Sequence, residues 1–211
     1  MSLGGPTPTI ILAAYDSSAR EVLACSTMEP STGRFWFSSK GNGAFLSRFD
    51  YHSGKFNSLE GRQIHVNNKE GLKGSHVLVD VDHGFERPTN DSSKQMLYPE
   101  GRREISRLVE AEGGKVASFY TNGGHYALIA MGNPTIIGNI TTAIGGPYDV
   151  SGIRHVIEAG GVATCYEILG RKLYSLDNSQ DIERADVVIS TNNHENLNNL
   201  EKVLNSAVTK N

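Results

Sequence analysis

The sequence predicts a layered α/β fold in a single domain, and three observations predict it. The first half of the 211-residue chain holds short β-branched and aromatic runs separated by turn residues, as antiparallel hairpins do. The second half alternates strand-like runs with helical patterns. No internal repeat or linker divides residues 1–211, and this length suits one well-filled domain.

The hairpin-rich half is expected to span about residues 6–120. Residues 8–14 (PTIILAA) form an apolar run typical of a buried strand, and the polar residues 15–20 supply a turn. Residues 31–33 (Ser-Thr-Gly) supply a second turn before an aromatic strand. Strands are expected at 8–14, 21–28, 34–38 and 76–81, with a short edge element at 41–46 and polar loops at 50–63 and 86–97.

The alternating half is expected to span about residues 121–211, after one helix. In that helix, Ile105, Leu108 and Val109 recur at helical spacing, and a Gly-Gly pair ends it. Helices are expected at 100–112, at 126–131, from Asp149 to 158, and at 195–208. Strands are expected at 116–119, 135–140, 162–165, 171–176 and 186–190.

Composition excludes several classes of protein. The 20 basic and 23 acidic residues give a net charge of -3 without a basic block, which argues against nucleic acid as a partner. No apolar run approaches the ~20 residues that cross a membrane, and no secretory signal opens the chain. Cys25 and Cys165 follow no metal or redox spacing, and their apolar context favours packing. We therefore expect a cytoplasmic protein, with residues 1–5 open to interpretation as a leader.

Four segments carry a resemblance to a known family. Residues 145–161 (GGPYDVSGIRHVIEAGG) resemble the C-terminal signature of the inositol monophosphatase family, in which a Trp-Asp pair opens a helix ending in Glu-Ala-Gly-Gly. Residues 20–47 resemble its central hairpin with the Gly-x-Gly-Ala-Phe end. Residues 121–128 (TNGGHYAL) stand where the family has a Gly-Ser-Ala-Ala-type helix start, and 186–204 resemble its final strand and helix. Order and spacing agree over almost the whole chain.

The resemblance implies an αβαβα sandwich of the sugar-phosphatase type. It also implies magnesium-dependent hydrolysis of a small inositol or sugar phosphate, commonly by a dimer. Asp149 matches the metal-binding aspartate, while Gly123, Gly124 and Thr142 would border the substrate cleft. The alternative interpretation of Asp149 is a helix N-cap, and the two roles are compatible.

The departures from the family pattern are equally informative. The Glu-Glu pair and the Asp-Pro-Leu/Ile-Asp-Gly-Thr motif, which would precede the first hairpin strand, do not occur in this sequence. Thr142 stands at the position of the inositol-contacting glutamate, and Tyr148 at that of the tryptophan. We therefore expect an N-terminally truncated domain with an incomplete magnesium centre and little activity alone. The alternative is a non-catalytic fold kept for dimerisation or for binding a phosphorylated small molecule.

Other candidate sites have simpler interpretations beside the functional one. Asp80, Asp82 and His83 could ligate a metal, but a strand end that enters a polar loop is the more common reason for such residues. His125 could bind phosphate at a helix start, although a surface or core histidine is the more common case. The Gly41–Gly43 stretch is typical of a turn more than of a phosphate loop.

Overall fold

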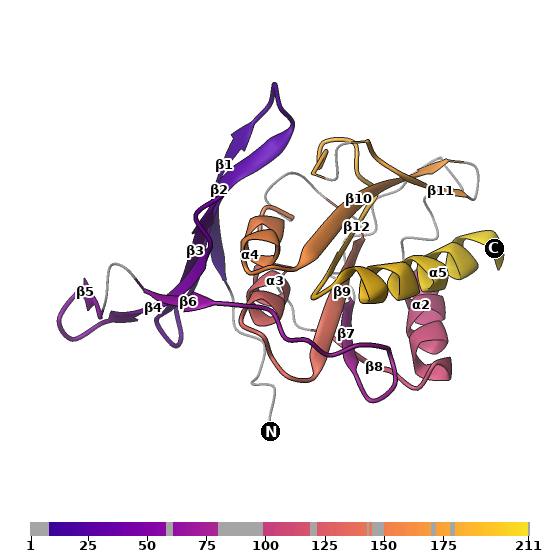
Figure 1. The fold of residues 1–211 in the computed structure, drawn as a ribbon, viewed down its shortest axis with the longest axis horizontal. Coiled ribbons are helices and arrows are strands. Elements are labelled where there is room, and N and C mark those ends of the chain that lie inside the picture. The colour runs from indigo at the N-terminus through magenta and orange to yellow at the C-terminus, as the bar shows by residue number, and fades with distance from the viewer. Residues whose placement is uncertain are drawn as a thin grey trace.

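The computed structural model describes residues 9–57, 61–79, 99–118, 122–142, 144, 150–169, 172–177 and 180–210, without the side chains of residues 99, 100 and 210. These residues form two β-sheets and four helices arranged in layers (Figure 1). In order, the layers are the first sheet, a pair of helices, the second sheet and a second pair of helices. The predicted layered α/β fold is confirmed.

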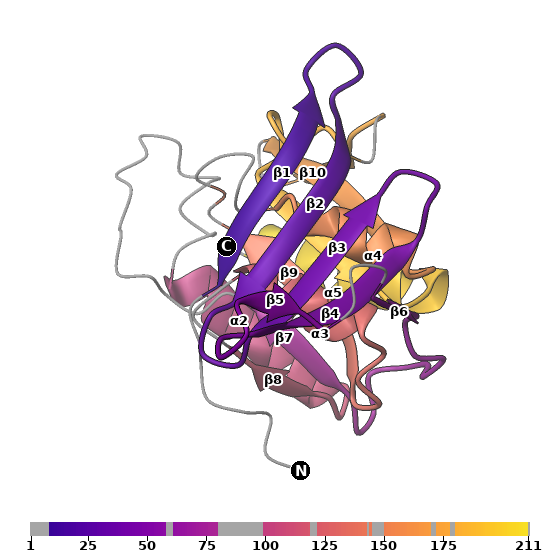
Figure 2. The same cartoon turned by 90° about the vertical axis from the view of Figure 1, so that its left-hand side faces the viewer.

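The first sheet is antiparallel and faces the viewer in Figure 2. Its strands follow the chain in the order β1-β2-β3-β4-β5, with β6 paired to β4. The strands are β1 (Ile10–Asp16), β2 (Glu21–Glu29), β3 (Arg34–Ser39), β4 (Ala44–Asp50), β5 (Lys55–Phe56) and β6 (Arg62–Ile64). The short edge element expected at 41–46 is instead a seven-residue strand inside the sheet, and the expected loop 50–63 contains β5 and the start of β6.

The second sheet is mixed, with the strand order β11-β10-β12-β9-β7-β8. Its strands are β7 (His76–Val79), β8 (Lys115–Ala117), β9 (Ile136–Thr142), β10 (Val162–Leu169), β11 (Lys172–Ser175) and β12 (Val187–Thr191). β7, β8 and β9 run parallel to one another, whereas β12 runs antiparallel to β9. The carboxyl ends of the three parallel strands therefore share one edge of the sheet.

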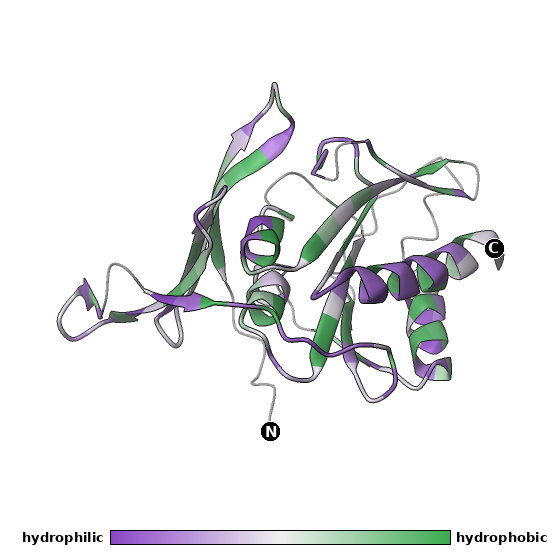
Figure 3. Ribbon diagram, in the orientation of Figure 1, coloured by the Kyte–Doolittle hydropathy of each residue, from purple (hydrophilic) through white to green (hydrophobic). Residues whose placement is uncertain are grey.

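The helices are α2 (Pro99–Ala111), α3 (Asn122–Ala130), α4 (Ile153–Glu158) and α5 (His194–Lys210). α3 and α4 lie between the two sheets, and α2 and α5 cover the opposite face of the second sheet (Figures 1 and 2). Apolar residues, green in Figure 3, gather on the strands of the second sheet, and both of its faces are buried. No helix within the described ranges has the length and apolar character needed to span a bilayer.

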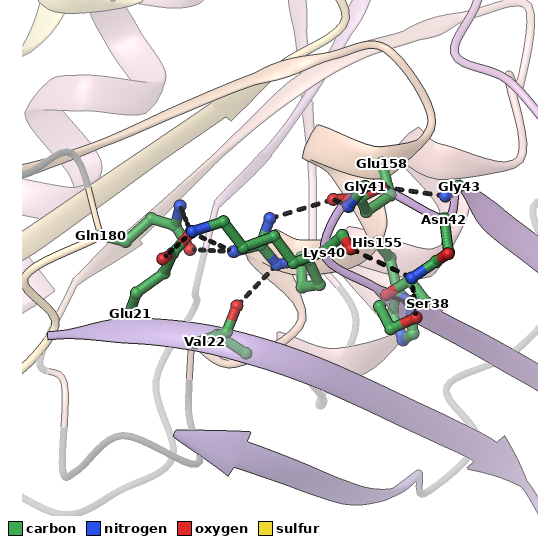
Figure 4. A network of polar contacts seen from close by, with 12 residues as sticks. Glu21, Val22, Ser38, Lys40, Gly41, Asn42, Gly43, His155, Glu158 and Gln180 are labelled. Carbon is green, nitrogen blue, oxygen red and sulfur yellow. Dashed lines mark hydrogen bonds and ion pairs between the residues drawn. The ribbon is translucent and has the colours of Figure 1, made fainter. Parts of the chain in front are cut away.

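A buried arginine of α4, Arg154, joins β2 of the first sheet to the segment before β12; its partners Glu21, Val22, Glu158 and Gln180 are labelled in Figure 4. The Arg154 guanidinium donates to the Val22 carbonyl at 2.6 Å, to Glu21 at 2.8 Å, to Glu158 at 3.0 Å and to Gln180 at 2.9 Å. Lys40 also donates to Glu21 at 2.6 Å. The hydrogen bonds from Lys40 and Arg154 hold the pKa of the Glu21 carboxyl below its ordinary value.

The same helix anchors the turn between β3 and β4. The Glu158 carboxylate accepts hydrogen bonds from the backbone N–H groups of Gly41 at 3.0 Å and Gly43 at 2.9 Å. Both glycines have positive φ angles, 75° and 86°, which explains their residue type. The turn interpretation of Gly41–Gly43 therefore holds, and its amides bind a carboxylate of the protein itself.

A second polar contact ties α4 to the first sheet at a fully buried histidine. His155 Nδ1 lies 2.8 Å from Ser38 Oγ, and Nε2 lies 3.0 Å from Thr27 Oγ1. Complete burial lowers the pKa of His155 to about 3, so the folded protein holds a neutral ring.

Substituting Arg154→Met removes the cation and leaves Glu21 and Glu158 with fewer partners in a buried setting. We expect a loss of about 3 kcal/mol in the free energy of unfolding, measured by urea denaturation. Arg107→Met is the matched control, because that arginine is exposed and its partner among the described residues is Glu104 on its own helix. Similar stability for both variants would contradict a structural role for the buried network.

The neutral state of His155 makes the fold sensitive to acid. Below pH 6.5 the unfolded chain binds a proton on this residue that the folded chain does not, so stability falls as pH falls towards about 3. The expected loss is about 1.4 kcal/mol per pH unit in that window. Urea unfolding at pH 7 and pH 4.5 should show a smaller acid-induced loss for His155→Gln than for the wild type. The exposed-site control His52→Gln should keep the wild-type loss.

Candidate ligand site at the carboxyl ends of the parallel strands

The carboxyl ends of β7, β8 and β9 form the edge at which α/β sheets usually bind ligands. α3 begins here, because it leads into β9, and the hydroxyl groups of Tyr126 and Thr141 lie 2.8 Å apart. α2 leads into β8, so its first turn reaches the same edge. The topology therefore brings the starts of two helices and the end of β9 together.

Thr142 ends β9 and is buried beside a charged residue that the sequence analysis did not single out. Its hydroxyl accepts a hydrogen bond from Arg102 Nε at 3.1 Å. Arg102 lies in the first turns of α2 and is only 9% exposed. The sequence did contain a signal: Arg102 precedes Ile105 by three positions and Val109 by seven, which places it on the apolar face of the helix.

Gly123, at the start of α3, lies beneath β1. A Cβ atom built there would lie 2.8 Å from Ile11 Cγ1 and 2.9 Å from Thr9 Oγ1, so a larger residue would have to displace these two side chains. Gly124 is half-buried. The structure thus places Gly123 against the first sheet, and substrate contact by Gly123, Gly124 and Thr142 stays a prediction.

The helix expected to open at Asp149 opens at Ile153 instead. Gly152 is its N-cap residue, no side chain caps it, and residues 150–152 form a turn. A Cβ atom on Gly152 would lie 2.6 Å from Tyr126 Cδ2, which shows how closely this turn packs on α3. Asp149 itself lies outside the described residues, so its role as metal ligand stays a prediction, whereas the N-cap position expected there belongs to Gly152.

The remaining candidates divide into three cases. Asp80, Asp82 and His83 lie outside the described residues. His125 is completely buried in α3, in accord with a core histidine. Cys25 and Cys165 are free and buried, and burial raises the pKa of their thiols to about 11 and about 12, which favours packing over nucleophilic roles.

A magnesium centre does not fit the side chains that the structure describes. Within those residues, no group of three or more His, Cys, Asp or Glu side chains could hold a metal ion. At the ligand edge, the charged side chain beside Thr142 is a guanidinium, which repels a cation and attracts an anion. The described donors therefore suit the phosphate of a ligand better than a metal.

Solved structures with a similar fold are known. The chain is similar to the extragenic suppressor protein suhB from Bartonella henselae, with a TM-score of 0.66 and 21% identity over 94% of this chain and 62% of that chain. It is also similar to an inositol monophosphatase from Anabaena, with a TM-score of 0.62 and 17% identity over 87% of this chain and 58% of that one. The chain has the inositol monophosphatase fold.

The Thermotoga maritima IMPase gives the same result, with a TM-score of 0.63 and 18% identity over 96% of this chain. The chain spans less than two thirds of the length of these inositol monophosphatase-fold structures. No protein-family model and no curated protein matches the sequence. The likeness therefore concerns the fold, which the sequence signature at 145–161 and the hairpin at 20–47 had indicated.

Proposed function

We propose that this protein is a phosphomonoesterase of the inositol monophosphatase type, acting on a small inositol or sugar phosphate. The observation that carries the proposal is the fold, which covers 94% of the chain in the Bartonella comparison and 87% in that with the Anabaena inositol monophosphatase. The fold has a parallel-strand edge, which is where α/β folds bind small ligands. Two free, buried cysteines accord with a reducing compartment, and we propose the cytoplasm.

We further propose that the chain hydrolyses phosphate esters poorly by itself. Magnesium prefers several oxygen ligands, chiefly carboxylates, and the described residues supply no such group. Asp149 is the proposed remaining ligand of this metal. A single carboxylate would bind magnesium weakly, so the protein would keep the capacity to bind a phosphorylated ligand more fully than the capacity to cleave it.

The alternative function is a non-catalytic one, in dimerisation or in binding a phosphorylated small molecule. The exposed face of β1 favours a dimer, because Ile10 is 57% and Leu12 is 71% exposed at the edge of the first sheet. No charged residue interrupts β1 before Asp16, whereas edge strands of monomeric proteins usually carry charges or proline. We propose a homodimer that buries this strand.

Phosphate release tests the catalytic part of the proposal. With inositol monophosphate and magnesium, we expect the chain to release negligible phosphate in a colorimetric assay, because its described side chains include no carboxylate cluster. A high rate that Asp149→Asn abolishes would contradict this expectation. It would mean that the remaining metal ligands come from residues outside the described ranges.

The mass in solution tests the dimer. We expect light scattering to give twice the 22.9 kDa of the chain for the wild type, and a shift towards the monomer for Leu12→Lys. Leu169→Lys is the matched control, because Leu169 is 51% exposed in the second sheet, away from β1. A monomeric wild type across a wide range of concentrations would remove the dimer proposal.

A further inference from the structure

We propose that Arg102 binds the phosphate group of the ligand, and that Thr142 orients its guanidinium for that contact. The ligand class rests on the proposed function, whereas the anion site rests on the side chains themselves. It lies at the carboxyl end of β9, on a residue that the sequence analysis did not consider.

The first argument is the burial of a charge with few partners. Arg102 is only 9% exposed, and a guanidinium has five N–H donors. One of these donors, Nε, is bonded to the neutral hydroxyl of Thr142. Within the described part of the chain, no carboxylate forms an ion pair with Arg102. Burying a cation is costly unless an anion accompanies it.

Arg154 shows how this fold satisfies an arginine whose role is structural. Its guanidinium contacts two carboxylates, an amide oxygen and a backbone carbonyl, all at 3.0 Å or less. Both arginines are buried, yet among the residues that the structure describes Arg102 is bonded to Thr142 alone. The difference between the two arginines supports the proposal that an anion from outside the chain is the partner of Arg102.

The second argument is position. Thr142 is the last residue of β9, and Arg102 belongs to the first turns of the helix that precedes the parallel strand β8. Ligands of α/β sheets bind at the carboxyl ends of parallel strands. A planar guanidinium whose Nε is held by a hydroxyl presents its remaining N–H groups in a fixed direction, which suits a tetrahedral oxyanion.

Calorimetric titration tests the proposal with two probes, inorganic phosphate and myo-inositol 1-phosphate, at constant ionic strength. Arg102→Gln should weaken the binding of both probes by about tenfold or more, the loss expected for a charge-assisted contact. Arg103→Gln is the matched control, because it removes the same charge from the exposed neighbouring position of α2 and should change affinity by less than about twofold. Acetate in place of phosphate distinguishes a phosphate site from a general anion site. A general anion site should bind both anions, whereas a phosphate site should bind phosphate in preference to acetate.

The melting temperature without added anion separates a binding role from a structural one. If Arg102 awaits an anion, Arg102→Gln should melt at or above the wild-type temperature, since a buried unpaired charge is removed. A structural ion pair would give a lower melting temperature and unchanged phosphate affinity, which would overturn the proposal. Should Arg102→Gln fail to fold, Arg102→Lys keeps the charge but not the planar fork, and should still weaken phosphate binding.

The outcomes also separate this proposal from the proposed function. If the wild type binds inositol phosphate and Arg102→Gln binds it equally well, Arg102 is not the phosphate contact, although the proposed function stands. If the wild type binds neither probe, both proposals fail. Equal losses in Arg102→Gln and Arg103→Gln would indicate a diffuse charge effect and would also overturn the assignment.

Discussion

The contacts of Arg154 are the constraint on which the rest of this structure depends. Two sheets can bury the helices between them only if the polar groups that meet there are satisfied. Arg154 does this for β2, α4 and the segment before β12 at once, since its guanidinium bonds to Glu21, Val22 and Gln180 while Glu158 completes the set. α4 is thereby held at a fixed distance from the first sheet.

The position of α4 in turn fixes residues at the carboxyl end of β9, where the candidate ligand site lies. With α4 fixed, the turn at 150–152 lies against Tyr126, and Gly152 has to be a glycine for this approach. Tyr126 in turn reaches Thr141, the neighbour of Thr142 on β9. A chain of packed side chains therefore leads from the buried arginine between the sheets to the end of β9.

The sequence could predict most of the elements but few of the contacts. Elements with strong local patterns lie within a few residues of their expected positions. Examples are the strands Glu21–Glu29 and Val187–Thr191 and the helix His194–Lys210. The length of β4 was missed, because the Gly41–Gly43 turn that starts it is fixed by Glu158 from a distant helix. Such long-range partners leave no periodic signal.

The buried polar contacts and the candidate site were predicted only in part, because the partners of their residues are distant in the sequence. Arg154 and Glu158 are four residues apart, a spacing that also describes a solvated pair on a helix surface, so their burial cannot be read from it. Thr142 was singled out by position, but its partner Arg102 comes from another helix. The side chains that cover Gly123 come from Thr9 and from Ile11 on β1, far away in the chain, so this packing contact could not be predicted from the sequence around Gly123.

The two faces of β1 have different surroundings, because successive side chains of a strand point to opposite sides. Ile11 presses on the start of α3, while its neighbours Ile10 and Leu12 point outwards at the sheet edge. A displacement of this strand cannot alter one face without the other. The exposed edge of the first sheet and the first turn of α3 are therefore only one strand apart, because β1 contributes side chains to both.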